Sequence, residues 1–321
     1  MSTSTPNRQP AAPPFTLPPP GLLTRFAPAP TGWLHLGHAV SALWVWGLAR
    51  ATGGRVLLRI EDHDRGRSRP AFEAGIVEEL QWLGLEWDEG FVPAKPGTPS
   101  PFRQSDHDAV YEAALARLDL AGRVYACDCS RRRLMASEGT QPGEEVRYPG
   151  TCRDRGLPWG PGLGLRVRLD EGDEAFDDLR LGPQVQAPAR QCGDVLVRDR
   201  LGQWTYQWCV VVDDLRQRIG LVVRGEDLLP STGRQLRLAR MLGLAAAPRF
   251  LHHPLVAHPD GTKLSKANHD TGLRELRAGG ATPEAVLGRA AFLSGLLARE
   301  RPVGAAEVGG LFASGREGRR A

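Results

Sequence analysis

"APAPTGWLHLGH", residues 27–38, combines two prolines, a Thr-Gly pair and two histidines just before an apolar segment. The segment 39–48 has the apolar density of a mostly buried helix, so these unusual residues lie at the start of a helix. The first N–H groups of a helix lack intrahelical acceptors, and the helix dipole favours negative charge there. Gly37 allows a ligand to approach the backbone closely. The stretch therefore predicts an anion site beside His35 and His38.

Strands and helices alternate outward from this stretch. Residues 22–28 indicate a strand ending at a proline, and a second strand follows at 55–62. Strands that alternate with helices of this length predict an α/β fold with a parallel sheet. The remaining predicted elements are helices 35–51, 70–83, 231–244 (capped by Ser231 or Thr232) and 282–297, a buried segment 206–214, and strands 194–199, 219–229 and 249–258.

Composition shifts divide the chain into five parts. The first is rich in proline and predicts an extended, disordered tail, and the third holds three cysteines and an arginine run, which suggests an insertion with its own small structure. The predicted parts are a tail at 1–20, a first half of the α/β domain at 21–119, an insertion at 120–190, a second half of that domain at 191–270 and a short helical region at 271–321.

Composition limits the class of protein. Hydrophobic residues make up 41% and charged residues 24% of the 321 residues, which is typical of a soluble globular protein. The net charge of +4 permits an anionic partner. We find neither an apolar run long enough to span a membrane nor a secretory signal. Five cysteines, an odd number, argue against a disulfide scaffold and for a reducing cytoplasm.

Two short motifs can handle phosphate groups. The histidines of "HLGH" (35–38) can stabilise charge on a phosphorus centre, although a helix cap or a metal pair are alternatives. The "KLSK" segment (263–266) can neutralise a leaving pyrophosphate through Lys263 and Lys266, although surface loops are often rich in lysine. Each motif is weak alone, and the two together, on either side of an α/β core, are far more specific.

In this order, the two motifs resemble the signatures of the class I aminoacyl-tRNA synthetases. Further segments resemble the catalytic domain of glutamyl-tRNA synthetases, and together the matches run from about residue 24 to 270. The resemblance implies a Rossmann-type parallel sheet with an inserted zinc-binding and connective subdomain. The matching segments are "RFAPAPTGWLHLGH" (25–38), "RIEDHDRGRS" (59–68), "LGLEWDEG" (83–90), "VVRGEDLLPSTGRQ" (222–235) and "KLSK".

The candidate amino-acid pocket suits glutamate. A carboxylate such as Glu61 suits an ammonium group, and the guanidinium groups of Arg25 and Arg224 suit two carboxylates. A salt bridge between Arg25 and Glu61 on the surface is the alternative. The resemblance implies a glutamate site made of Arg25, Phe26, Ala27, Pro28, Ala29, Glu61, Tyr206 and Arg224, an ATP site of His35, Gly37, His38 and Lys266, catalytic roles for His35, His38, Lys263 and Lys266, and Mg²⁺ accompanying ATP.

Three cysteines in the predicted insertion suit a structural zinc ion. Cys127, Cys129 and Cys152 supply three soft ligands, and no histidine occurs between residues 107 and 252 to supply a fourth. Tyr148 is close enough in sequence to face the same ion, and this pattern resembles one offshoot of the family. Water or Asp128 as the fourth ligand, or three free cysteines without metal, are the alternatives.

That offshoot is the glutamyl-queuosine tRNA(Asp) synthetases. Only 55 residues follow Lys266, too few for a large anticodon-binding domain. The resemblance implies ATP-dependent activation of L-glutamate and its transfer to queuosine in the anticodon of tRNA(Asp), by a protein we expect to be monomeric. The residues show no obvious general base for this transfer. A compact glutamyl-tRNA synthetase charging the 3′ end of tRNA(Glu), a non-catalytic tRNA-binding paralogue and a zinc-dependent RNA-binding module are the alternatives.

Overall fold

A computed structural model of the chain describes residues 14–94, 98–138, 145–256 and 272–313. Lys263 and Lys266, two of the predicted ATP-loop residues, lie outside the described residues. Within the described part, no helix combines the length and the apolar character needed to cross a lipid bilayer.

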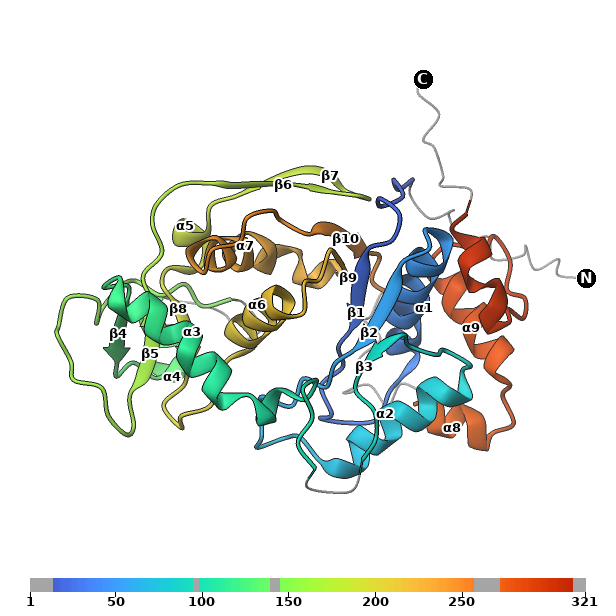
Figure 1. Ribbon diagram of the computed structural model, residues 1–321, viewed down its shortest axis with the longest axis horizontal. Helices are drawn as coiled ribbons and strands as arrows, with labels where there is room; N and C mark the ends of the chain where they lie inside the picture. Colours follow the sequence, from blue (N-terminus) through green and yellow to red (C-terminus); the bar gives the residue numbers. More distant parts are fainter. Residues whose placement is uncertain (1–13, 95–97, 139–144, 257–271, 314–321) are drawn as a thin grey trace, which may run out of the picture.

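A seven-stranded sheet forms the centre of the molecule (Figure 1). Its first six strands in spatial order pair in parallel, and the last pairs antiparallel with its neighbour. The predicted parallel sheet is therefore confirmed. In spatial order the strands are β3 (Glu89–Gly90), β2 (Arg55–Leu58), β1 (Leu23–Phe26), β9 (Leu221–Gly225), β10 (Arg249–His253), β6 (Glu174–Asp178) and β7 (Gly182–Gln186).

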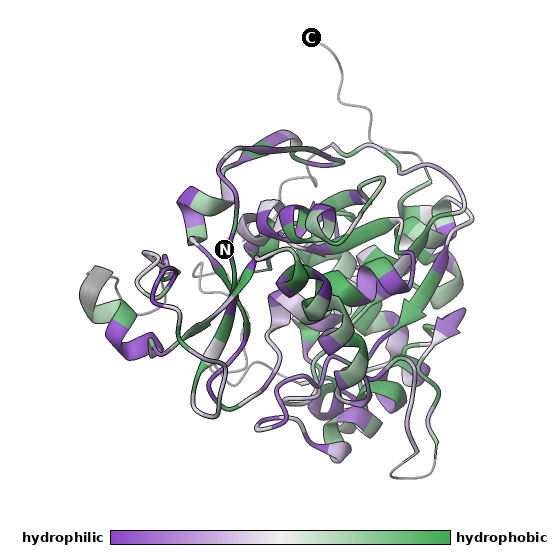
Figure 2. Ribbon diagram, turned by 60° about the vertical axis from the view of Figure 1, so that its left-hand side comes forward, coloured by the Kyte–Doolittle hydropathy of each residue, from purple (hydrophilic) through white to green (hydrophobic). Residues whose placement is uncertain are grey.

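Helices cover both faces of this sheet, with α1 and α9 on one side and α6 and α7 on the other (Figure 1). Hydrophobic residues concentrate in the sheet and these flanking helices (Figure 2). The helices are α1 (Leu36–Ala51), α2 (Pro70–Trp82), α3 (Asp108–Leu120), α4 (Arg131–Glu138), α5 (Pro188–Cys192), α6 (Tyr206–Arg216), α7 (Thr232–Met241), α8 (Leu273–Ala278) and α9 (Pro283–Leu293), with 3₁₀ turns η1 (Gln104–Asp106), η2 (Glu226–Ser231) and η4 (Ala305–Leu311).

The first helix is held by close packing on nearly all sides. Trp44 of α1 is fully buried, and its ring meets the rings of Phe15 and Phe312 edge-on. Gly47 leaves room for Phe312, because a Cβ atom at that position would lie 2.0 Å from the Phe312 ring. This packing fixes α1 against β1, β2 and β9, and so fixes the histidines at its start.

The strands of the two sheets do not follow the boundaries predicted at residues 120 and 190. A second, antiparallel sheet contains β4 (Val124–Cys127), β5 (Gly164–Val167) and β8 (Val195–Arg198). The hairpin β6–β7 lies within the predicted insertion 120–190, yet it pairs with β10 of the central sheet. The strand predicted at 194–199 instead joins the small sheet. The five-part division therefore stays a prediction about folding units.

The predicted cap of the helix that begins near residue 231 is wrong. Neither side chain caps α7: the hydroxyl of Ser231 accepts a hydrogen bond from Gln207, and that of Thr232 accepts one from Arg224. By contrast, Thr282 caps α9 by accepting from the backbone N–H of Ala285. Thr232 thus holds Arg224, which lines the cavity described below.

A buried carboxyl group holds the loop before α1. Glu79 of α2 is 2% exposed and accepts a hydrogen bond from the backbone N–H of Leu34. Burial raises the pKa of Glu79 to about 7 from its ordinary 4.5. The folded protein therefore keeps a proton that the unfolded chain releases near pH 4.5, so this group lowers the free energy of unfolding as pH rises from about 4.5 to about 7.

We expect Glu79→Gln to remove that part of the pH dependence. Above neutral pH the variant should be more stable than the parent by at most about 3 kcal/mol, and near pH 4.5 the two should converge. Urea unfolding at several pH values measures the difference. The exposed neighbour Glu78, which pairs with Arg277, provides the control Glu78→Gln. Parallel stability curves for parent and Glu79→Gln would contradict the assignment.

Candidate active site

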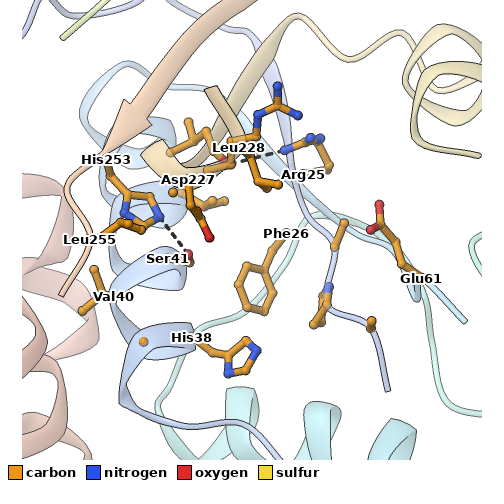
Figure 3. A pocket seen from close by; sticks show the side chains of 18 of the residues that line it. Arg25, Phe26, His38, Val40, Ser41, Glu61, Asp227, Leu228, His253 and Leu255 are labelled. Atoms are coloured by element: carbon orange, nitrogen blue, oxygen red, sulfur yellow. Dashed lines mark hydrogen bonds between the residues drawn. The ribbon is translucent and has the colours of Figure 1, made fainter. Parts of the chain in front are cut away.

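A cavity of about 540 Å³ opens at the carboxyl ends of β1, β2, β9 and β10, beside the start of α1 (Figure 3). In open α/β sheets ligands bind at this edge, where neighbouring connections leave in opposite directions. Here β1 lies between β2 and β9, so the crevice lies at such a switch point. The predicted residues that line it are Arg25, Phe26, Ala27, Pro28, Ala29, His35, Gly37, His38, Glu61, Tyr206 and Arg224.

The two histidines cap α1 and line the cavity at the same time. Nδ1 of His35 accepts a hydrogen bond from the backbone N–H of Gly37 at 3.1 Å, and Nδ1 of His38 accepts from the N–H of His35 at 3.1 Å. Their ring centroids are 4.0 Å apart. A Cβ atom on Gly37 would lie 2.9 Å from Cε1 of His35, so a larger residue at this position would displace the capping ring. The alternative role of the two histidines as helix caps is therefore confirmed, and both rings also line the cavity.

A network of buried charges forms the floor beside β1 and β2. Arg59 is fully buried and donates to Asp214 at 2.8 Å and to Glu61 at 3.0 Å. Arg25 donates to the same Asp214 at 3.2 Å and to the carbonyl of Val223 at 3.3 Å. The alternative pairing of Arg25 with Glu61 is wrong, because each has another partner.

This network keeps its charges in place. Burial alone would raise the pKa of Asp214, but the two guanidinium groups outweigh burial and lower it. Burial likewise disfavours the charge of Arg59, yet Asp214, Glu61 and Asp213 raise its pKa. Because Arg59 holds Oε1 of Glu61, the carboxylate is fixed at the cavity edge (Figure 3), where it can accept N–H groups of an ammonium ion.

Arg224 is a buried cation among neutral partners. It is 5% exposed and donates to Nε2 of His252, to Oε1 of Gln235 and to Oγ1 of Thr232 at 3.1, 2.7 and 2.8 Å. His252 is neutral in this arrangement, since Nε2 accepts from Arg224 while Nδ1 lies 2.6 Å from Asp178. Burial lowers the pKa of both Arg224 and His252. The site therefore favours a ligand that brings a negative charge to Arg224.

Several residues of the cavity were not predicted. His253 lines it, and its Nε2 lies 2.8 Å from Oγ of Ser41 on α1. Burial lowers the pKa of His253 to about 4, so its ring is neutral at pH 7. The sequence did offer a signal for His253, because His252 and His253 are two polar residues at the end of the apolar strand β10. Asp178, which supports the site through His252 without lining the cavity, gave no such signal, because it comes from β6, in the part expected to form a separate insertion.

The three predicted cysteines meet in a separate cluster. The sulfur atoms of Cys127, Cys129 and Cys152 all lie within 4.8 Å of one another, and those of Cys129 and Cys152 are 3.7 Å apart. Tetrahedral zinc with bonds of about 2.3 Å places sulfur ligands roughly 3.8 Å apart, so the donor set and spacing fit that ion. The hydroxyl of Tyr148 lies 3.5 Å from Sγ of Cys127, and Oδ1 of Asp128 lies 3.2 Å from Sγ of Cys152.

Comparison with known proteins identifies the family of this chain. The family described as "tRNA synthetases class I (E and Q), catalytic domain" matches residues 21–296. The chain is 45% identical to a glutamyl-Q tRNA(Asp) synthetase of Symbiobacterium thermophilum over 88% of this chain and 89% of that protein. It is 39% identical to a glutamate–tRNA ligase 2 of Syntrophus aciditrophicus, over 87% of this chain and 58% of that protein.

A solved structure confirms the predicted fold class. The glutamate-tRNA synthetase of Elizabethkingia anophelis superimposes with a TM-score of 0.73 at 27% identity, over 90% of this chain and 65% of that one. The chain thus spans just under two thirds of that synthetase. The parallel sheet, the cavity at its carboxyl edge and these matches lead to one conclusion: the chain belongs to the class I tRNA synthetases of the glutamyl and glutaminyl (E and Q) type.

Proposed function

We propose that this protein activates L-glutamate with ATP and transfers the glutamyl group to queuosine in the anticodon of tRNA(Asp). The observation that carries the choice of amino acid is Arg224, a buried cation whose described hydrogen-bond partners are all neutral. A glutamate side-chain carboxylate supplies the missing charge, whereas the neutral amide of glutamine does not. The names of relatives at 45% and 41% identity support the acceptor.

In the first step the α-carboxylate of glutamate attacks the α-phosphorus of ATP, and pyrophosphate leaves. Glu61 binds the amino group, while Arg25 and Arg224 bind the carboxylates. His35 and His38 stabilise the negative charge that develops on the phosphates at the positive end of α1. Lys263 and Lys266 contribute cationic groups to the ATP, and Mg²⁺ accompanies the nucleotide.

In the second step a hydroxyl of the queuosine cyclopentene ring attacks the carbonyl carbon of the glutamyl-adenylate. An ester bond forms, and AMP leaves with the electron pair of the anhydride bond. Tyr206 lines the same cavity as Glu61 and Arg224. We also expect the protein to be a monomer and to act in the cytoplasm, where tRNA and ATP occur.

A second candidate is a glutamate–tRNA ligase acting on the 3′ end of tRNA(Glu). Relatives with that name are 39% to 41% identical to this chain, so identity alone separates the two functions only slightly. Coverage differs more: the chain spans 84% to 97% of four glutamyl-Q relatives and 55% to 58% of four glutamate–tRNA ligases.

Transfer of radiolabelled glutamate tests the proposal. The substrates are tRNA(Asp) with and without queuosine, each also trimmed of its terminal adenosine, and tRNA(Glu). We expect label that requires queuosine and survives trimming. Label on tRNA(Glu) that trimming abolishes would instead establish the second candidate. Normal ATP–pyrophosphate exchange with glutamate but no labelled RNA would leave activation standing and overturn the acceptor.

We further propose that the cysteine cluster holds a structural zinc ion, with Tyr148 as its fourth ligand. Tyr148 is 2% exposed, whereas both carboxylate oxygens of Asp128 already accept from Arg155 at 2.9 Å. A zinc ion held by these residues would link β4 to the loop before β5 within a small apolar cluster.

Removal of one ligand should release the metal. We expect Cys129→Ser to lower bound zinc from about one ion per chain to well below that and to lower the melting temperature. Metal analysis by mass spectrometry and thermal unfolding measure both. Cys192→Ser, a buried cysteine outside the cluster, is the matched control and should keep its zinc. Parent protein without zinc, or an unchanged zinc content in Cys129→Ser, would contradict the site.

A further inference from the structure

A second cavity adjoins the first and shares one residue with it. This cavity, of about 250 Å³, lies where the segment after β2 meets the start of α3 and the loop between β8 and α6. His63 lines both cavities, so it stands at their junction. We call this second space the acceptor cavity. The residues of the acceptor cavity used below are His63, Arg65, Gln104, Asp108, Leu201 and Trp204.

A chain of hydrogen bonds fixes the orientation of His63. Nδ1 of His63 lies 2.7 Å from Oε1 of Gln104, whose Nε2 donates to Oδ2 of Asp213 at 2.9 Å. Gln104 is 1% exposed and Asp213 is fully buried. Tyr111 and Arg216 also donate to Asp213, which keeps this carboxylate an acceptor.

The direction of this chain determines the tautomer of His63. Because a carboxylate only accepts, the amide of Gln104 must turn its N–H group toward Asp213 and its oxygen toward His63. Nδ1 of His63 therefore carries the proton and donates it to that oxygen. The lone pair then resides on Nε2, for which no described residue serves as hydrogen-bond partner. A base oriented by a third group in this way is the usual arrangement for proton abstraction.

We infer that the acceptor cavity receives the modified base and that Nε2 of His63 is the general base of the transfer step. This inference rests on the proposed function. The attacking hydroxyl gives its proton to Nε2, its oxygen forms the ester bond with the glutamyl carbonyl carbon, and AMP leaves with the electrons of the anhydride bond. The imidazolium then returns the proton to solvent. His63 thus supplies the base that sequence reasoning did not find.

The chemistry of the acceptor cavity suits a nucleobase. The oxygens of Asp108 accept from Arg65 at 2.8 Å and from Trp204 at 3.1 Å, so Asp108 is held in place, and its remaining lone pairs can accept from the N–H groups on the edge of a guanine-like base. Leu201 is 82% exposed and, with the buried Trp204, gives an apolar wall. An extruded base is read by such edge contacts and by apolar faces.

Separate measurement of the two steps tests the role of His63. In His63→Ala we expect single-turnover transfer from preformed adenylate to fall about 100-fold further than ATP–pyrophosphate exchange does. His107→Ala, a histidine outside both cavities, is the matched control. Equal losses in the two steps, or transfer within threefold of the parent, would overturn the base assignment. Failure of the proposed function would show differently, as an absence of label on queuosine-containing tRNA with the parent protein.

A second variant tests the acceptor cavity itself. Leu201→Ala removes an exposed side chain, so it should not affect folding. We expect the KM for queuosine-containing tRNA(Asp) to rise about fivefold while kcat changes little, because the lost contact binds the base without taking part in the reaction. An unchanged KM would overturn the assignment of this cavity to the acceptor. An equal rise for tRNA(Glu) would indicate that the cavity receives a 3′-terminal adenosine instead.

Discussion

Replacing Arg224 by glutamine is expected to reduce kcat/KM for glutamate in ATP–pyrophosphate exchange by about 10³-fold. Loss of one partner from a buried, hydrogen-bonded charge pair costs about 2–5 kcal/mol, and every 1.4 kcal/mol is a factor of about ten. The parent should favour glutamate over glutamine, and this preference should largely disappear in the variant. The loss should fall mainly on KM if the contact is equally strong in the ground state.

The same substitution should have little effect on the free protein. Arg224 is buried with neutral partners, so its removal relieves a desolvation cost while it also removes hydrogen bonds to Gln235 and Thr232. We expect a change in the free energy of unfolding below about 2 kcal/mol. Glutamate should raise the melting temperature of the parent but not that of the variant.

Arg249→Gln is the control for this experiment, because Arg249 is an exposed arginine at the start of β10. It should leave the glutamate KM and the stabilisation by glutamate unchanged. An Arg224→Gln protein that kept both its glutamate KM and its selectivity would show that the negative charge binds elsewhere. The assignment of Arg224 to the side-chain carboxylate would then be wrong.

The part of the site that follows strand ends could be predicted from the sequence. Arg25, Glu61 and Arg224 are charged residues within or just after apolar strands, and parallel strands bring such positions to one edge of the sheet. The structure places all three on the same cavity. Local pattern was sufficient here because each strand carried its own polar residue, and the α/β alternation fixed which ends would meet.

The supporting contacts could not be predicted because they depend on pairings between distant segments. Asp178 reaches His252 only because β6 pairs with β10, and the hairpin's sequence resembled an isolated insertion. Asp213 lies more than 100 residues from Gln104, with which it forms a hydrogen bond. The neighbours of Asp213 in the sequence show that it lies on a buried helix face, but they do not show which distant residue it contacts. The orientation of His63 therefore becomes visible only in the folded chain.

The second large effect concerns His35, whose two roles can be separated by one substitution. Nδ1 of His35 caps α1, and its ring lines the cavity at the predicted phosphate position. Asparagine is among the best helix N-caps, but its amide is shorter than an imidazole and cannot place an N–H group where Nε2 of His35 lies when Nδ1 forms the cap. In His35→Asn we therefore expect thermal stability close to that of the parent and a fall of about 10²–10³-fold in the rate of adenylate formation.

His35→Ala provides the comparison that assigns the loss. It removes both the cap and the imidazole, so it should lose about 1 kcal/mol of stability in addition to the same loss of rate. If His35→Asn instead formed adenylate at nearly the parental rate, His35 would act only as a cap, and the charge on the phosphates would have to be met by His38 and by cations outside the described residues. Equal rates in the two variants, with unequal stabilities, would show that the catalytic effect comes from the imidazole, because only the capping group differs between them.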